Sequence, residues 1–433
     1  MENKKNVAVI GLWHLGCSVA ASLASSGFNV TGFDFDKKDI EKLQQGILPI
    51  QEAGLTELTQ TMLKLKQLSF TSDFSKLKGS QFIVIGYDTP VGDNDKPNLF
   101  VIEKAVRAIG KYASTNSTVI IMSQIPAGTS RKIFNKLKKK IKGLEVVYNP
   151  ENLRLSQAID TYLNADRQII GVSSKVAEER MRDFYSFYKN PILFMSLESA
   201  EFVKHGVNSF LAMSVSFINQ ISDLSEKLGA NIVDVVKGMK SDTRIGQKAF
   251  LAPGLGFAGG TLGRDLRVLE GLAQVNKVSL PLITVIYKIN QNRKEVFYKK
   301  IIGQLKNLKG KKIVMFGLVY KPGTNTLRRS LALEIANWLT KKGAVVNGFD
   351  PSLDNPKLVL PVKLFSDPYE ASMGADAVVI ITEWPEFKNL DYNKISKNLK
   401  QLNIFDTKNI LSKNDLESLN FNYFGTGIGK YDL

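Results

Sequence analysis

Cysteine and histidine are scarce in this chain, and long apolar runs are missing. Its 433 residues include one cysteine, Cys17, and two histidines, His14 and His205. One cysteine cannot form an intrachain disulfide, and so small a set cannot build a cysteine or histidine metal cluster, so we expect no metal. No stretch approaches the ~20 apolar residues that cross a bilayer. The opening MENKKNVAVIGL also lacks the order of a signal peptide. These absences predict a cytoplasmic protein with no membrane partner.

The chain carries an excess of positive charge. Its 58 Lys and Arg outnumber its 41 Asp and Glu, which gives a net charge of +17. Basic chains often bind nucleic acid, membranes or phosphorylated ligands. The densest run, Lys138-Lys139-Lys140 with Lys142, has no interleaved aromatic residue that could stack on bases. We therefore expect no nucleic-acid partner, and a phosphorylated small substrate explains part of the charge.

Short apolar stretches alternate with helical patterns in the first part of the chain. Expected helices lie near 98–112 and 127–141, and expected strands lie at Val7–Ile10, Asn29–Phe33, Phe82–Ile85, Val119–Met122 and Glu145–Tyr148. Continuous apolar strands that alternate with helices predict a parallel sheet covered on both faces. Residues 1–196 are therefore expected to form a doubly wound α/β domain.

The middle of the chain has a different pattern, and the last third repeats the first. Long helices are expected over Leu197–Leu228 and Leu282–Leu305, with a glycine-rich loop, Ala252–Gly263, between them. Residues 306–433 again alternate, with a helix near 330–341 and strands at 312–317, 345–349, 377–381 and 403–405. The sequence thus predicts a helical region over 197–305 and a second, smaller α/β domain over 306–433.

The turn after the first expected strand is close to a dinucleotide fingerprint. It reads Gly11-Leu12-Trp13-His14-Leu15-Gly16 against the pattern GxGxxG, so a tryptophan replaces the second glycine. That indole either points away from the pyrophosphate or blocks it. Asp34 ends the second expected strand, where a carboxylate accepts hydrogen bonds from a ribose and favours NAD over NADP. The alternative is a doubly wound domain that has lost its dinucleotide.

Further motifs follow in order along the chain. They are Val30–Asp34, Gly46–Leu55 (GILPIQEAGL), Thr89-Pro90, Asn149-Pro150-Glu151 with Leu153-Arg154, Ala200–Lys204 with Asn208–Phe210, Phe250–Gly260 (FLAPGLGFAGG), Lys321–Gly323 and Thr382–Trp384. In this order and spacing they resemble the motifs of the UDP-glucose/GDP-mannose dehydrogenase family nearly end to end. The resemblance implies a cytoplasmic NAD enzyme with two Rossmann-like domains joined by a long helix that also builds a homodimer.

The resemblance also implies a ligand for each region and residues that bind it. Region 1–196 becomes the dinucleotide-binding domain, 197–305 the dimerisation and substrate-loop region, and 306–433 the Rossmann-like domain that binds the nucleotide sugar. The implied NAD-binding residues are Gly11, Trp13, His14, Leu15, Gly16, Asp34, Thr89, Pro90 and Gln124. The implied substrate-binding residues are Leu153, Arg154, Arg244, Phe250, Leu251, Gly256, Phe257 and Lys321.

The chain departs from the family pattern where the chemistry is expected. The family loop continues GGSCFPKD, and its cysteine attacks the sugar aldehyde. Here Gly259 to Asp265 read GGTLGRD, one residue shorter and without the cysteine. Thr261 is a weak nucleophile without an adjacent base. Cys17 cannot replace the family cysteine, because it lies on the helix expected directly after the Gly11 turn, beside the fingerprint. In addition, the family's STVP reads Ser123-Gln124-Ile125-Pro126, and the acid after NPEFLR becomes Leu155.

A set of residues suited to alcohol oxidation survives. Lys204 can stabilise the alkoxide, and Asn208, one helical turn further, can donate a hydrogen bond to the same oxygen. Asp265 and Glu151 can hold or deprotonate a water. The alternative for Lys204 is a solvated helix lysine, and for Arg244 a surface ion pair. His14 is expected to be structural rather than catalytic, and Trp338 and Trp384 to be core or interface residues.

These residues predict a two-electron, reversible hydride transfer between NAD and a nucleotide sugar. The reaction would stop at a carbonyl or return the hydride to give an epimer. One alternative is the ordinary four-electron oxidation to a uronic acid, through a hydrated aldehyde without covalent catalysis. Another is a non-catalytic subunit that binds the nucleotide sugar. Trp13, which replaces a glycine of the dinucleotide fingerprint, favours the non-catalytic alternative. The joint presence of Glu151, Lys204, Asn208 and Asp265 argues against that alternative.

Overall fold

The chain divides into two compact units. A computed structural model describes residues 5–50, 52–89, 98–150, 153, 156–258, 260–353 and 358–429. The first unit comprises Met1–Val207 and Arg267–Val278, and the second comprises Asn208–Leu266 and Ser279–Leu433. Helices α8 (Leu197–Lys227) and α10 (Leu262–Asn276) each run from one unit into the other. The division into 1–196, 197–305 and 306–433 stays a prediction.

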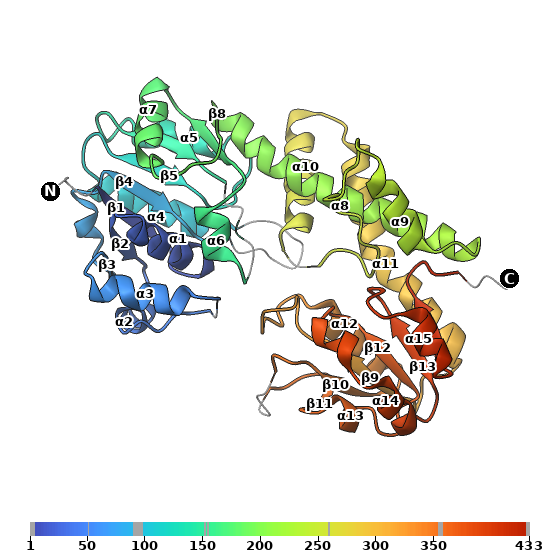
Figure 1. The fold of residues 1–433 in the computed structure, drawn as a ribbon. Helices are drawn as coiled ribbons and strands as arrows, with labels where there is room; N and C mark the ends of the chain where they lie inside the picture. The colour runs from blue at the N-terminus through green and yellow to red at the C-terminus, as the bar shows by residue number, and fades with distance from the viewer. Residues whose placement is uncertain are drawn as a thin grey trace. The chain divides into compact units, whose positions relative to one another are not determined.

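An eight-stranded sheet forms the centre of the first unit (Figure 1). Its strand order is β3-β2-β1-β4-β5-β6-β7-β8, and every neighbouring pair is parallel except β6 and β7. The strands are β1 (Asn6–Ile10), β2 (Asn29–Phe33), β3 (Leu68–Thr71), β4 (Phe82–Ile85), β5 (Thr118–Ile121), β6 (Glu145–Tyr148), β7 (Gln168–Val172) and β8 (Ile192–Ser196). The chain reverses its direction of travel across the sheet between β1 and β4, where open α/β sheets bind their ligands.

Helices cover both faces of this sheet. They are α1 (His14–Ser25), α2 (Lys37–Gln44), α3 (Leu55–Lys64), η1 (Phe74–Leu77), α4 (Phe100–Tyr112), α5 (Thr129–Leu137), α6 (Ala158–Leu163) and α7 (Lys175–Phe184). Alternate residues of β1 belong to two separate cores: Val7 and Val9 to one, and Ala8 and Ile10 to the other. This explains why the strand reads as a continuous apolar run, since both of its faces are buried.

The second unit contains a six-stranded sheet in which every pair is parallel. Its order is β11-β10-β9-β12-β13-β14, which again reverses next to its first strand. The strands are β9 (Lys312–Phe316), β10 (Val345–Phe349), β11 (Lys363–Phe365), β12 (Ala377–Ile380), β13 (Asn403–Asp406) and β14 (Asn422–Gly425). The helices are α9 (Ile232–Ser241), α11 (Pro281–Leu305), α12 (Leu331–Lys341), α13 (Pro368–Ala371), η2 (Pro385–Asn389), α14 (Tyr392–Asn398) and α15 (Lys413–Ser418).

The predicted α/β fold with two doubly wound domains is confirmed, and one local expectation is wrong. The five strands predicted for the first sheet pair in parallel, whereas β7, which was not predicted, runs antiparallel to β6. The expected glycine-rich loop ends earlier than Gly263, because α10 already begins at Leu262. Trp384 is buried in the core, and the partly buried Trp338 packs against the same core and stacks on Tyr298 with 3.9 Å between ring centres. No helix in the described part of the chain is long and apolar enough to cross a membrane.

Candidate active site

The glycine turn after β1 has the backbone geometry that a dinucleotide fingerprint requires. Gly11 adopts φ +96°, and its N–H donates to the carbonyl oxygen of Phe33 at 2.9 Å. A Cβ on Gly16 would lie 1.6 Å from the carbonyl oxygen of Gly11, so only glycine lets α1 pack this closely on the turn. The two glycines that survive from the fingerprint are thus the two that the fold itself needs.

Asp34 is held beside this turn at the end of β2. Its Oδ2 accepts from the Leu12 N–H at 2.8 Å, and its Oδ1 accepts from the Phe35 N–H at 2.6 Å. The carboxylate remains half-buried, so it can still meet a ribose. Trp13 is 45% exposed, so the indole that replaces the second glycine does not pack into the core.

His14 lies at the start of α1 and belongs to a buried polar cluster. Its Nε2 lies 2.8 Å from Oε2 of Glu52. The Glu52 carboxylate also accepts from the backbone N–H groups of Ser156 and Ala158, each at 3.1 Å. These contacts tie the helix start to two distant segments, which supports a structural role for His14.

The remaining described NAD-binding candidates lie at the same edge of the sheet. Thr89 follows β4 and Gln124 follows β5, and both are buried. The Thr89 hydroxyl donates to the backbone carbonyl of Gln124 at 2.8 Å. With Gly11 after β1 and Asp34 after β2, these residues surround the point where the strand order reverses. Pro90, Glu151 and Arg154 lie outside the described residues, and Leu153 packs partly against one core of this unit.

Two residues just before Thr89 join this edge and were not singled out from the sequence. The Tyr87 ring covers Gly11, since a Cβ there would lie 2.7 Å from its atoms. Burial, and then the charge of Asp34, raise the pKa of the Tyr87 phenol. Asp88 accepts from the Leu15 N–H at 3.2 Å. Their place directly before the Thr89-Pro90 motif was the available signal.

The catalytic candidates on α8 and α10 are buried. Lys204 is 8% exposed, so the solvated-lysine alternative is wrong. Four residues further along α8, Asn208 lies in the second unit, where its amide donates to Oδ2 of Asp265. Asp265, in the first turn of α10, is fully buried. The carboxylate therefore orients the Asn208 amide.

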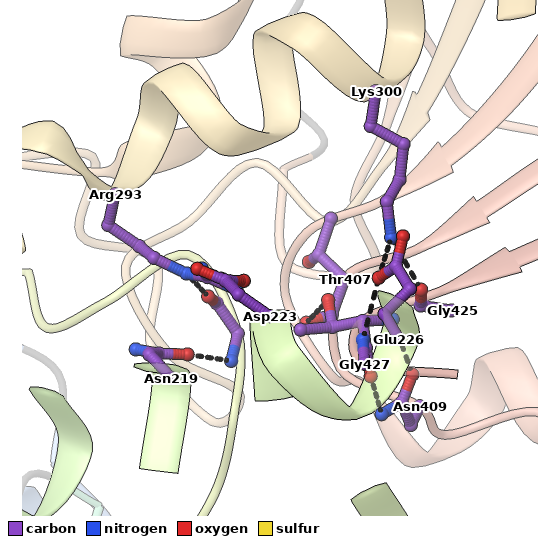
Figure 2. A network of polar contacts seen from close by, with 11 residues as sticks. Asn219, Asp223, Glu226, Arg293, Lys300, Thr407, Asn409, Gly425 and Gly427 are labelled. Carbon is purple, nitrogen blue, oxygen red and sulfur yellow. Dashed lines mark hydrogen bonds and ion pairs between the residues drawn. The ribbon is translucent and has the colours of Figure 1, made fainter. Parts of the chain in front are cut away.

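The glycine-rich loop before α10 is fixed by side chains from two long helices (Figure 2). The Gly254 N–H donates to Oδ1 of Asn219 at 2.8 Å, and the Gly254 carbonyl accepts from Nε of Arg293 at 2.7 Å. Nη1 of Arg293 also donates to Oδ1 of Asp223 at 2.5 Å. Asn219 and Asp223 lie on α8 and Arg293 on α11, so both helices hold the backbone of one residue.

A neighbouring set of contacts in Figure 2 joins the same helices to the end of β14. Nζ of Lys300, on α11, donates to Oε2 of Glu226 at 2.6 Å and to the carbonyl of Gly425 at 2.8 Å. The Gly427 N–H donates to the same Glu226 oxygen at 3.1 Å. In the second unit, α8 and α11 thus hold both the glycine-rich loop and the end of strand β14.

The substrate-binding candidates within this loop have different environments. Gly256 has φ +92°, and a Cβ there would lie 2.3 Å from Oδ1 of Asn290. That same oxygen accepts from the Phe257 N–H at 2.8 Å, and the Asn290 amide donates to the Phe257 carbonyl at 2.9 Å. Phe250 is 49% exposed, whereas Leu251 is buried in a small core. The Phe250 side chain is therefore accessible from solvent, whereas the Leu251 side chain is enclosed, and their roles in substrate binding stay predictions.

Two charged substrate-binding candidates, Arg244 and Lys321, are exposed on the surface. The Arg244 side chain is 88% exposed and paired with Asp242 at 2.6 Å, which is the surface ion pair that the sequence left open. Lys321 is exposed in the segment after β9. The cross-subunit role of Arg244 stays a prediction.

Among the residues that the structure describes, no activated nucleophile lies at the position expected for the family cysteine. Thr261 is exposed, and Leu262 packs partly into a small apolar cluster. Cys17 is buried in α1, and burial, followed by the charges of Asp34 and Asp88, raises the pKa of its thiol. A buried, protonated thiol cannot attack an aldehyde. Among the described residues, no group of three or more His, Cys, Asp and Glu could hold a metal ion either.

The second sheet repeats the turn geometry but uses its aspartate internally. Gly317 has φ +84° and donates to the carbonyl of Phe349 at 2.9 Å. Oδ2 of Asp350 accepts from the N–H groups of Leu318 and Val319 at 2.6 and 3.0 Å. Asp350 is only 2% exposed, so its carboxylate is not offered to a ribose as Asp34 is. The geometry therefore favours the first sheet as the NAD site.

Three family models match the chain in succession. They are the NAD binding domain at residues 5–189, the central domain at 198–292 and the UDP binding domain at 314–413 of the UDP-glucose/GDP-mannose dehydrogenase family. The chain belongs to this family. It is an NAD-dependent oxidoreductase, and the match to the NAD binding domain, residues 5–189, lies within the first unit.

Curated relatives match over nearly the whole chain. UDP-glucose 6-dehydrogenase of Bacillus subtilis is 32% identical, covering 98% of this chain and 93% of its own length. The enzyme of Rickettsia prowazekii is 35% identical over 98% of this chain and 99% of its own. Among solved structures, a UDP-glucose dehydrogenase from Pyrobaculum islandicum superimposes with a TM-score of 0.89 at 26% identity, covering 99% of this chain and 98% of its own. A UDP-D-ManNAc dehydrogenase from Pyrococcus horikoshii reaches 0.86 at 26% identity, covering 98% and 99%.

Proposed function

We propose that this enzyme removes two electrons from a CH–OH group of a nucleotide sugar and does not form a covalent intermediate. The reaction stops at a carbonyl, or the hydride returns to give an epimer. The observation that carries this proposal is that Lys204, Asn208 and Asp265, the residues suited to alcohol oxidation, are each buried, while the loop before α10 lacks the cysteine. The names of the curated relatives make a UDP-hexose the first substrate to test.

In this proposal the buried polar residues stabilise the oxygen that develops charge. NAD, held by the residues at the Gly11–Asp34 edge of the first sheet, would supply the hydride acceptor. Lys204 provides the cation for the alkoxide, and because it is buried its charge is little screened by water. The Asn208 amide has two hydrogens; one is held by Asp265, and the other remains for the substrate oxygen. The hydroxyl proton leaves to a water held by Asp265, with Glu151 as the second candidate.

Without a positioned thiol, the aldehyde is not expected to undergo the second oxidation. An aldehyde is a poor hydride donor until a nucleophile adds to its carbonyl. A positioned thiolate has a high effective concentration, worth several kcal/mol over a free water. Thr261 and Leu262 occupy its place, and Cys17 is enclosed in α1. The carbonyl product is therefore expected to accumulate or to be reduced again.

The four-electron oxidation is the second candidate. The curated relatives carry the name UDP-glucose 6-dehydrogenase and match almost end to end, which favours a uronic acid product. In this chain that product needs a water to add to the aldehyde. The two candidates share their first step and differ in the number of NADH formed per substrate.

We also propose that the working form is a cytoplasmic homodimer. Large apolar side chains recur every seven residues on α8: Phe210, Phe217 and Leu224, each about half exposed or more. A spacing of seven residues between apolar side chains is typical of a helix that packs along a second helix. A second copy of α8 would cover this stripe, and the dimer is the state in which Arg244 would reach a neighbouring substrate.

Product stoichiometry separates the two reactions. The protein is incubated with NAD and a panel of nucleotide sugars, while NADH is followed by absorbance and products by NMR. At most one NADH per substrate and no carboxylate support the two-electron reaction, and an epimer with no net NADH is its internal-return form. Two NADH per uronic acid at a steady rate would refute it and establish the four-electron oxidation.

A further inference from the structure

The start of helix α1 is occupied by two carboxylates. Asp34 accepts from the Leu12 N–H at 2.8 Å, and Asp88 accepts from the Leu15 N–H at 3.2 Å. Trp13, at the N-cap position, provides no side-chain hydrogen bond to the helix. Asp88, from the segment after β4, therefore binds a backbone donor of the first turn that has no partner within the helix.

A dinucleotide uses the same end of this helix. In doubly wound domains the pyrophosphate lies at the N-terminus of the first helix, where free N–H groups and the helix dipole favour negative charge. A carboxylate on the Leu15 N–H occupies one of those donors and repels the pyrophosphate. Asp34 does not conflict in this way, because its expected partner is the ribose. Asp88 therefore opposes the ligand that this turn is built to hold.

We propose that Asp88 is a competitor, built into the fold, for the cofactor pyrophosphate. Its carboxylate binds the Leu15 N–H and has to leave it when NAD binds, so it lowers the affinity for NAD. A second observation concerns the residue next to it. The Tyr87 hydroxyl is buried and has no hydrogen-bond partner among the described residues. Since an unpaired buried hydroxyl costs free energy, a shift of this segment on binding has a gain to offset its cost.

Charge alone does not explain the effect that we expect from Asp88. Asp39, near the start of α2, also acts electrostatically on the buried Cys17 thiol, as Asp34 and Asp88 do. Within the described part of the chain, its side chain makes no hydrogen bond or ion pair with the α1 turn. Asp39→Asn therefore removes the same charge from the same neighbourhood without freeing the Leu15 N–H, and it serves as the matched control.

The test is calorimetric titration of NAD, ADP and adenosine into the full-length protein and its variants. We expect Asp88→Ala to tighten the binding of NAD and ADP about tenfold, equivalent to about 1.4 kcal/mol. Asp88→Asn, whose amide oxygen can still accept from the Leu15 N–H, should tighten both by a smaller factor. Adenosine, which lacks phosphate, should bind all forms equally, and Asp39→Asn should change NAD affinity less than twofold.

The inference rests on NAD as the cofactor and not on the number of electrons transferred. NAD affinity that is unchanged or weaker in both Asp88 variants would overturn it and leave the proposed reaction intact. Equal tightening by Asp39→Asn would also overturn it, because a general charge effect would then suffice. If no form binds NAD, the inference fails together with the proposed function.

Discussion

Arg293 holds the glycine-rich loop from α11, and its replacement by methionine tests how much that contact contributes. Methionine keeps an unbranched apolar stem but removes both donors: Nε, which binds the Gly254 carbonyl at 2.7 Å, and Nη1, which binds Asp223 at 2.5 Å. The Arg293 side chain is 7% exposed, whereas Asp223 is 41% exposed. The two former partners therefore respond differently to the change.

The expected cost follows from the burial of those partners. The Gly254 carbonyl is buried and loses its side-chain donor, which costs about 1–3 kcal/mol. Asp223 remains largely solvated, so its lost ion pair adds little. A total near 2 kcal/mol corresponds to a fall in Tm of about 4–8 °C for a unit of this size. Because the loop carries the substrate-binding candidates, KM for the nucleotide sugar should rise severalfold while NAD affinity is unchanged.

Thermal unfolding by circular dichroism and steady-state kinetics measure the two effects. Arg182→Met is the matched control. Like Arg293, Arg182 donates two hydrogen bonds, here both to the Glu178 carboxylate, but its side chain is 61% exposed. The control should leave both Tm and KM unchanged. If Arg293→Met behaves like Arg182→Met in both measurements, the loop does not depend on this contact and the reasoning is wrong.

Three further predictions concern the cofactor, the first hydride step and the dimer. Asp34→Asn should narrow the preference for NAD over NADP, since its carboxylate pairs with ribose hydroxyls and repels a 2′-phosphate; titration of both cofactors measures this, and wild-type protein that binds NADP as tightly as NAD contradicts it. Lys204→Ala should lower kcat at least about 100-fold with NAD affinity unchanged, because the alkoxide loses its cation; the exposed Lys227→Ala on the same helix is the control, and similar kcat values in both would exclude the role. Phe217→Glu should convert a dimer into a monomer in light scattering at micromolar concentration, because it places charge on the exposed α8 stripe; a wild-type protein that is already monomeric refutes the dimer.

Local pattern was enough to predict most of the parallel sheets. Strands β2 and β6 begin and end where the apolar runs predict, at Asn29–Phe33 and Glu145–Tyr148. The apolar run of β1 reflects burial on both faces, which any sequence at that position must satisfy. The antiparallel pairing of β7 with β6 was not predictable in this way, because the residue pattern of a single strand does not show the direction in which it pairs.

The cofactor edge was predictable for a similar reason. Gly11 and Asp34 follow adjacent strands of a doubly wound domain, so their meeting is a consequence of the topology. Whether Trp13 enters the core could not be read from the sequence, since an indole is tolerated in the core and on the surface. Its 45% exposure is a result of tertiary packing.

The sequence by itself determined the fold class, the glycine turn after β1 and the missing thiol, because these depend on residue type and on short spacing. Tertiary structure alone decided which polar groups pair. Asp88 meets the Leu15 N–H across 73 positions, Asn208 meets Asp265 across 57, and Arg293 meets the Gly254 carbonyl across 39. Such pairs form because a buried donor or acceptor must be satisfied by whatever the packed elements bring near it. Spacing along the chain does not encode that proximity.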